Sequence, residues 1–329
     1  MRSLKFLLII FALSPIIGKS QIFDYLINFE GIGDNREYHS QKALSQTILG
    51  SRGAFEAGLK IDNHMIRAGL NHLLEFGSDI DFHKPKLTLY YQYNDKIKQF
   101  KFGAFPRRNT INFPLAILTD TLLYYRPNIE GLYGQIAWPW GHQAGFVDWV
   151  SRQTAINREN FMAGLSGEVF HKYLFMENYM LLFHDAKAAI HIPGDHIKDY
   201  FGYLITGGIR TFNNDRFTGY MKAGVLGSLF RERSVTNGFI YQNSFYAEVK
   251  GKLKNYGINS TLHTGGSHRF AYGDKFYGTK NYWRTDLIWY FINHPKVKGT
   301  FNLSFHLIEW NCLDQQQQMS IIYIFEKKQ

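Results

Sequence analysis

The sequence predicts an all-β protein: a transmembrane antiparallel β-barrel of about 16 strands, with a range of roughly 14 to 18, that follows a cleaved signal peptide. Three observations lead to this prediction. The chain begins with an export signal, apolar and polar residues alternate along many long segments, and prolines fall between those segments. The composition agrees, because 17% aromatic and only 19% charged residues describe a chain that must keep much apolar surface away from water.

Residues 1–20 carry the features of a secretory signal peptide. Two basic residues precede the apolar stretch 6–12, and a small-x-small cleavage site follows at residues 18–20. The apolar stretch is shorter than the roughly 20 residues that a spanning helix needs. We therefore expect one mature domain, residues 21–329, and the loss of three basic residues lowers the formal charge from +10 to +7.

The strand signal is an alternation of apolar and polar residues with a period of two. In the segment 215–230, Phe217, Met221 and Val225 share one face, whereas Tyr220 and Lys222 share the other. The segments with this pattern are, in chain order, 52–60, 66–75, 87–93, 217–229, 239–251, 282–291, 297–307 and 319–325. Most of them exceed the five or six residues of an ordinary strand and reach the roughly 9 to 11 that cross a membrane.

Proline placement supports the same segmentation, because proline lacks the backbone donor that a central strand uses. Seven prolines lie between candidate strands: Pro85, Pro106, Pro114, Pro127, Pro139, Pro193 and Pro295. A soluble β-sandwich would also alternate, so alternation alone leaves both architectures open. The signal peptide, the strand lengths and the aromatic residues near strand ends favour the membrane barrel.

Several short motifs carry a resemblance to a known group of proteins. They are 34–38 (DNREY), 46–52 (QTILGSR), 62–71 (DNHMIRAGLN), 85–93 (PKLTLYYQY), 145–149 (GFVDW) and 158–164 (RENFMAG). These segments, in about the first half of the chain, resemble porin-like outer-membrane proteins of Bacteroidota. The resemblance implies an outer-membrane barrel and brings no catalytic residues with it.

Basic residues outnumber acidic ones on the predicted polar faces, by eleven to five. If these faces line a water-filled lumen, their charge favours anions. The alternative is that the charges pair across neighbouring strands and only hold the wall together. The candidates for lumen selectivity are Arg52, Arg67, Lys86, Lys101, Arg210, Arg216, Lys222, Lys250, Arg284 and Lys298.

Residues 31–51 form the longest segment without clear alternation, which predicts a long connection. Long connections in such barrels fold inward as a constriction or bind ligands. Asp34, Arg36 and Glu37 are therefore candidates for a polar constriction in the lumen. An exposed, solvated loop is the alternative.

Other polar clusters give weaker signals. His and Asp residues concentrate in 184–199, but their spacing matches no tight metal site, so we expect no metal and no cofactor. Asp148 and Glu159 resemble an acid and base pair, yet neighbouring arginines suggest ion pairing instead. A membrane lipid hydrolase would carry Ser and His on adjacent strands; Ser304 and His306 share one face of a single strand, a pairing that often arises by chance. Without a recognised nucleophile motif, no catalytic residue is predicted.

Together these features predict a channel in the outer membrane of a Gram-negative bacterium for passive diffusion of small hydrophilic, anionic solutes. Its other partners would be membrane lipid and lipopolysaccharide. Nucleic acid is not expected as a partner, because the basic residues are dispersed along strands of an exported chain. The alternatives are a barrel enzyme acting on lipid or lipopolysaccharide and a secreted β-sandwich that binds glycans. The oligomeric state stays open.

Overall fold

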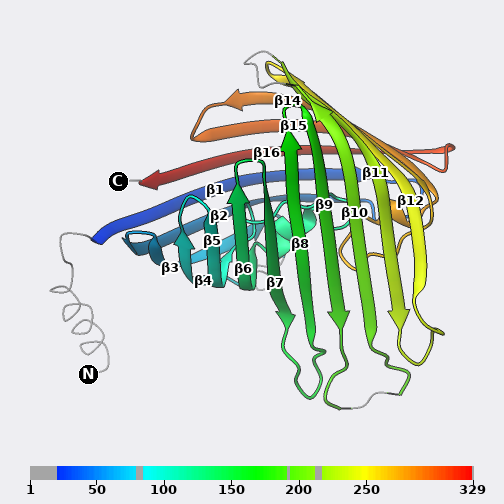
Figure 1. Cartoon of the computed structure of the whole chain (residues 1–329), viewed down its shortest axis with the longest axis horizontal. Helices are drawn as coiled ribbons and strands as arrows, with labels where there is room; N and C mark the ends of the chain where they lie inside the picture. The colour runs from blue at the N-terminus through cyan, green and yellow to red at the C-terminus, as the bar shows by residue number, and fades with distance from the viewer. Residues whose placement is uncertain (1–20, 79–83, 191–192, 212–216, 328–329) are drawn as a thin grey trace.

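Sixteen antiparallel strands close into one barrel in the computed structural model, which confirms the predicted fold class (Figure 1). The structure describes residues 21–78, 84–190, 193–211 and 217–327. The predicted signal peptide lies outside the described residues. No helix in the described ranges has the length and hydrophobicity that crossing a membrane requires.

Every strand pairs with its neighbours in sequence, and β1 pairs with β16 to close the ring. The first eight strands are β1 (Gln21–Glu37), β2 (Gln46–Ile61), β3 (His64–Glu75), β4 (Lys86–Asn94), β5 (Lys98–Pro106), β6 (Asn128–Trp138), β7 (Gly141–Ser151) and β8 (Asn160–His171). The others are β9 (Leu174–Asp185), β10 (Lys198–Arg210), β11 (Phe217–Glu232), β12 (Ile240–Leu253), β13 (Tyr256–Gly265), β14 (Asn281–Asn293), β15 (Val297–Ile308) and β16 (Cys312–Lys327).

The alternation found in the sequence separates an outer face from a lumen face. On β11, Met221 and Val225 are 51% and 44% exposed, whereas Lys222 between them is 8% exposed. Apolar side chains therefore cover the outside of the wall, where the strands of a membrane barrel meet lipid. The closed barrel with this outer face argues against the soluble β-sandwich.

The connections differ in length at the two ends of the barrel. Short turns such as 62–63, 139–140 and 254–255 lie at one end, where β1 also begins and β16 ends (Figure 1). Most of the connections at the opposite end are longer. This is the usual pattern of outer-membrane barrels, which have short turns on the periplasmic side and longer loops outside the cell.

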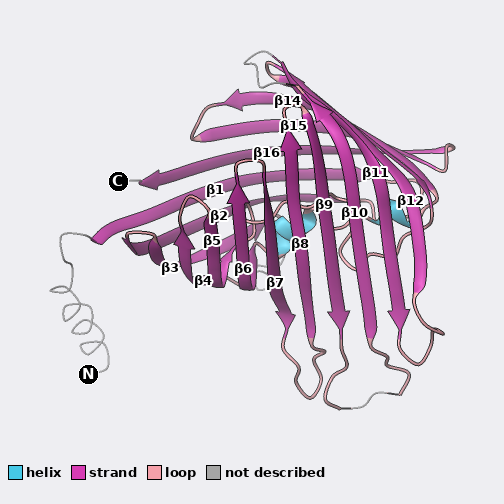
Figure 2. Ribbon diagram, viewed as in Figure 1, coloured by secondary structure: helices cyan, strands magenta, loops and turns pink. Residues whose placement is uncertain are grey.

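Two of the long connections fold into the lumen, and together we call them the plug: residues 107–127 and 266–280. The first contains the short helix α2 (Thr121–Tyr125), and the second contains the turn η3 (Lys275–Gly278) (Figure 2). They bind each other, because Thr119 N donates to Tyr272 O at 2.7 Å and Asp274 N donates to Leu115 O at 2.9 Å. A side chain at Gly273 would lie 2.1 Å from Ala116 O, so this approach requires glycine.

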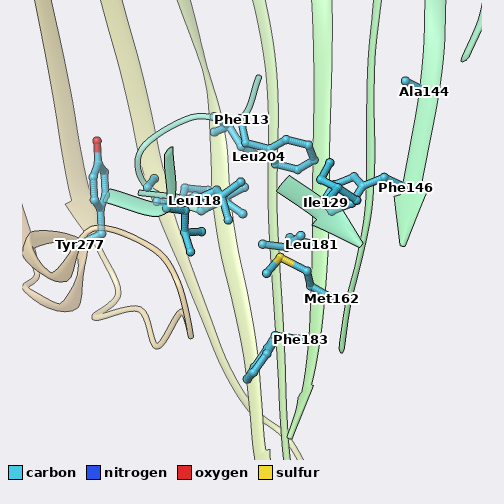
Figure 3. Packing of buried hydrophobic residues seen from close by; sticks show 14 of the residues in the cluster. Phe113, Leu118, Ile129, Ala144, Phe146, Met162, Leu181, Phe183, Leu204 and Tyr277 are labelled. Atoms are coloured by element: carbon cyan, nitrogen blue, oxygen red, sulfur yellow. The ribbon is translucent and has the colours of Figure 1, made fainter. Parts of the chain in front are cut away.

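The plug and the wall form one apolar core inside the barrel. Phe113 packs edge to face on Phe146 of β7, and Figure 3 shows Phe113 and Leu118 of the plug among residues of the wall. Other buried plug residues in this core are Ala116, Ile117, Leu122, Phe276 and Tyr277. The wall contributes Tyr90, Phe105, Ile129, Tyr133, Ala144, Met162, Leu181, Phe183, Leu204, Leu226, Tyr246, Tyr282 and Ile308.

The expected long connection over residues 31–51 was wrong, because β1 continues to Glu37 and β2 begins at Gln46. The end of β1 does not look like a strand in the sequence. Its lumen face carries Asp34 and Arg36, while its outer face carries Gly31 and Gly33 in place of large apolar residues. The alternation is present, but the outward glycines hide it.

Candidate functional site

The lumen has an apolar side and a polar side. The apolar core involves β4 to β12, β14 and β15, whereas the lumen face of β16, β1, β2 and β3 carries mostly charged and amide side chains, with Ile32, Ile48 and Leu73 buried among them. We call these residues the polar stripe: Asp24, Asn28, Glu30, Asp34, Arg36, Arg52, Glu56, Arg67, Asn71, Gln316 and Gln318. Two cavities lie along it, one on each side of the plug.

The inner cavity, of about 310 Å³, lies between the plug and the short-turn end. Arg67 meets three carboxylates there, with its guanidinium nitrogens 2.5 Å from Asp24, 3.7 Å from Glu56 and 3.3 Å from Glu326. The cavity also contains cations from the wall, Arg52 and Lys101, and one from the plug, Arg108. Of these four cations, only Arg67 lies within ion-pair distance of Asp24, Glu56 and Glu326.

Each of the other three cations, Arg52, Lys101 and Arg108, forms a contact between the wall and the plug. Arg52 donates to Tyr124 O in α2, and Lys101 Nζ donates to Thr110 Oγ1 at 2.8 Å. Arg108 forms a short ion pair with Glu30 on β1. These polar contacts connect the plug to the stripe, where the apolar core does not reach.

The outer cavity, of about 460 Å³, lies at the end with the longer connections. Asp34 accepts from Arg36 at 2.6 Å and from Gln316 Nε2 at 2.7 Å, and Gln318 Nε2 donates to Asp120 of the plug at 3.1 Å.

Asp274, in the plug, also lines the outer cavity, and its Oδ2 lies 3.8 Å from Arg284. Burial raises the pKa of Asp274, and Arg284 opposes that rise. The cavity thus carries carboxylates and cations in one place.

The structure describes nine of the ten predicted selectivity residues, and it places them in three situations. Four of them pair with carboxylates, as the alternative reading expected: Arg67, Arg210, Lys222 and Arg284. Arg52 and Lys101 face neutral acceptors in the inner cavity. Lys86, Lys250 and Lys298 are exposed on their strands, and Arg216 lies outside the described residues. The role of these ten residues in selectivity stays a prediction.

Of the three predicted constriction residues, two face the lumen. Asp34 is buried and Arg36 lines the outer cavity, so both belong to the polar stripe on β1. Glu37 faces away and accepts from Gln315 Nε2 at 2.6 Å and from Asn35 Nδ2 at 2.9 Å. The three residues therefore lie on a strand of the wall and not on a loop across the pore.

The weaker polar clusters turn out to be ion pairs that involve strands of the wall and the connections between them. Asp148 pairs with the buried Arg107 at the base of the plug. Arg158 binds both Asp185 and Asp195, which leaves these carboxylates engaged. In the described ranges, no group of three or more His, Cys, Asp or Glu side chains is placed to hold a metal ion.

Ser304 and His306 share the lumen face, but each contacts a different residue. Arg284 donates to Ser304 Oγ at 3.3 Å, and His306 Nδ1 lies 2.7 Å from Tyr282 Oη.

A Ser–His cluster does form elsewhere, around Ser244 on β12. Its Oγ lies 2.9 Å from His263 Nε2 and 2.7 Å from His268 Nε2, and His268 Nδ1 lies 2.8 Å from Ser228 Oγ. The sequence did not reveal this cluster, because it joins β11, β12, β13 and the plug across 19 to 40 residues.

The Ser244 cluster has the nucleophile and the base of an acyl-transfer site, but it lacks the access for a substrate and the orienting carboxylate of such a site. Ser244 is 5% exposed and His263 is fully buried. Within the described part of the chain, no carboxylate bonds to either histidine, and His263 Nδ1 has no hydrogen-bond partner. Burial, with a smaller contribution from His263, lowers the pKa of His268 to about 3. In this conformation the cluster connects the plug to the wall.

Comparison with known proteins gives one family match. The family model described as Lipid A 3'-O-deacylase-type matches residues 21–325. A search of curated proteins finds no match.

Solved structures with the same fold are outer-membrane proteins. Pseudomonas aeruginosa OpdK with vanillate has a TM-score of 0.53 at 10% identity, covering 93% of this chain and 99% of that chain. P. aeruginosa OccK5 (OpdH) has a TM-score of 0.54 at 9% identity, covering 93% and 98%. The loop L8 deletion mutant of OmpT from Vibrio cholerae has a TM-score of 0.56 at 9% identity, covering 93% and 100%. At such identities the likeness shows the fold alone, and that fold is the outer-membrane β-barrel implied by the resemblance.

Acidification is expected to loosen the second plug segment. The pKa of His268 in the folded protein, about 3, lies below its ordinary value of 6.5, so the unfolded segment binds more protons between these values. The stability that neutral His268 contributes is therefore fully present above about pH 6.5 and falls as the pH drops toward 3. Hydrogen exchange of residues 266–280, corrected for intrinsic rates, should show protection decreasing from pH 7 to pH 4.

His268→Gln is the matched control, because glutamine can bond both serines but does not titrate. Its protection should change much less over the same interval. Equal pH dependence in the variant and the wild type would assign the effect to other groups.

Proposed function

The chain belongs to the Lipid A 3'-O-deacylase-type family, and from this premise we propose that it acts in the outer membrane of a Gram-negative bacterium as a gated channel for small hydrophilic anions. Lipid A is the membrane anchor of lipopolysaccharide, so the family description supports that location. Conduction and ester hydrolysis are then the two activities to weigh against the geometry.

The observation that carries the channel proposal is the polar stripe with a cavity on each side of the plug. The inner cavity opens along Asn28, Glu30 and Arg52, and the outer cavity begins at Arg36. These residues follow one another along β1 and β2, so movement of the plug away from the stripe would join the two cavities into one hydrated path. The other side of the lumen holds the apolar core and an ion-pair cluster of Lys222 with Glu177 and Glu248, and we expect no comparable route for an ion there.

The plug closes this path where it contacts the stripe. Arg52 with Tyr124 O and Arg108 with Glu30 join the plug to β2 and β1 beside the inner cavity. We expect α2 to move away from β1 and β2 in the conducting state, while the apolar core keeps the remaining plug in place.

The charge of the two cavities favours anions over cations. Their lining contains eight basic and five acidic residues. The basic ones are Arg36, Lys42, Arg52, Arg67, Lys101, Arg108, Lys275 and Arg284, and the acidic ones are Glu30, Glu56, Asp120, Asp274 and Glu326. A basic excess in a confined lumen attracts anions and raises their local concentration.

Hydrolysis of an acyl ester of lipid A is the second candidate, favoured by the family match and by the Ser244 cluster. A serine hydroxyl beside a histidine base can attack an ester carbonyl. Against this, Ser244 faces the lumen behind the plug and its histidines have no orienting carboxylate in the described ranges. A lipid acyl chain would need the plug to leave before it reached the hydroxyl, so this candidate ranks second.

Loosening the plug at the stripe should open the channel more often. In Arg108→Gln the ion pair with Glu30 is lost, and a loss of about 1.4 kcal/mol shifts a closed–open equilibrium about tenfold. Single-channel recordings in planar bilayers should therefore show an open probability about tenfold above wild type, with preference for chloride over potassium.

Arg233→Gln is the matched control, because it removes an exposed ion pair with Asp199 at the barrel rim. Its open probability should equal that of the wild type. Wild type and both variants inserting without any conductance would reject the channel proposal.

Hydrolysis can be tested independently of conduction. Incubation of the protein with lipid A in mixed micelles, followed by mass spectrometry, should leave the acyl chains of lipid A intact. Fatty acid release by the wild type that is lost in Ser244→Ala would instead establish the second candidate. Release that persists in that variant would locate an esterase site elsewhere.

A further inference from the structure

Arg52 and Lys101 in the inner cavity are cations without a carboxylate partner. No carboxylate oxygen of the described residues lies within 4.0 Å of either one. Arg52 is only 6% exposed, so its charge is withdrawn from water. Arg67 in the same cavity shows the opposite situation, with three carboxylates around one guanidinium.

The partners that Arg52 and Lys101 do have are neutral. Arg52 donates to Asn71 Oδ1 at 2.9 Å and to Tyr124 O, and its buried Nε has no hydrogen-bond partner. Lys101 donates to Thr110 Oγ1, and its Nζ lies 5.7 Å from the centre of the Phe105 ring. A buried cation costs several kcal/mol of desolvation, and neutral acceptors offset only part of it.

The carboxylates of the cavity are already committed to other groups. Glu30 pairs with Arg108, and Glu56 accepts from Tyr90 Oη at 2.9 Å and faces Arg67. Glu326 also belongs to the Arg67 cluster. Glu30 attracts Arg52 and Glu56 attracts Lys101 only from beyond ion-pair distance, so neither cation has a carboxylate bound to it and each can still bind a mobile anion.

The cavity has room for a small ligand. Its volume of about 310 Å³ corresponds to about ten water molecules at roughly 30 Å³ each. Leu26, Ala54 and Leu123 supply an apolar lining beside the two cations. A ligand with a charged head and a compact body of about ten non-hydrogen atoms fits this combination.

We propose that the inner cavity is a binding site for a small oxyanion, a carboxylate or a phosphate, whose charged oxygens bind Arg52 and Lys101. The planar guanidinium of Arg52 suits two oxygens of one such group, and the ammonium of Lys101 supplies a second positive charge. This inference rests on the proposed function, because it assigns the class of solute that the channel selects.

The proposed site is connected to the plug, because Arg52 and Lys101 also donate hydrogen bonds to the plug. An oxyanion competes with Tyr124 O for Arg52 and with Thr110 Oγ1 for Lys101. Whatever free energy couples the site to the plug acts in both directions, so a bound anion changes the position of the plug and the plug changes the affinity.

The test is a binding titration of the full-length protein in detergent, which does not depend on conduction. Melting temperature is followed while inorganic phosphate or sodium acetate replaces sodium chloride at constant ionic strength. Saturable stabilisation by one or both anions supports the site, and the anion that acts assigns its class. Stabilisation by neither, or a linear response to both, overturns it.

Variants test whether the stabilisation comes from this cavity. Arg52→Gln and Lys101→Gln should each weaken the apparent affinity about tenfold, the effect of about 1.4 kcal/mol. Lys254→Gln, an exposed lysine of the β12–β13 turn, should bind as the wild type does. Loss of affinity in all three variants alike would overturn the site.

The two variants also keep the proposal testable if one of them fails to fold. Heat-modifiable migration on gels identifies folded barrels, and Lys101→Gln alone carries the comparison if Arg52→Gln does not fold. A protein that binds anions in this way but never conducts would refute the channel and leave the binding site standing.

Discussion

The constraint on which this structure depends is the width of its own lumen. Closing sixteen strands makes an interior that the side chains of the wall cannot fill. The chain solves this with two connections that fold inward and bind each other, from Thr119 to Tyr272 and from Asp274 to Leu115. Which lumen residues the plug covers, and which it leaves beside a cavity, depends on where it lies.

The plug uses different forces on its two sides. Toward β4 to β12 it buries aromatic and aliphatic side chains, and the buried Arg107 pairs with Asp148 while donating to Arg126 O at 2.9 Å and Asn128 O at 3.2 Å. Toward β1 and β2 it makes a few polar contacts through Arg52 and Arg108. Apolar packing resists local opening more than isolated polar contacts beside water do, so we expect the stripe to be the side that opens first. This asymmetry is the physical basis of the proposed gate.

The wall could be predicted from the sequence, whereas the plug and the candidate site could not. Lipid outside and polar groups inside force an alternation such as that of Met221, Lys222 and Val225, which a reader can count. Leu204 and Leu226 sit on the lumen face against the plug, and nothing local in the sequence indicates that a loop will cover them. Likewise Ser244 meets His268 only because the second plug segment returns to β12. Such contacts form only when the barrel has closed, so the alternation of apolar and polar residues in the sequence cannot predict them.

The central claim is that the plug must leave the polar stripe for the lumen to conduct. The most direct measurement is single-channel recording of a protein in which a cleavable bifunctional thiol reagent joins Glu30→Cys to Arg108→Cys, in a Cys312→Ser background. The account predicts silence while the tether is intact and conductance steps after reduction. Equal conductance before and after reduction would contradict it.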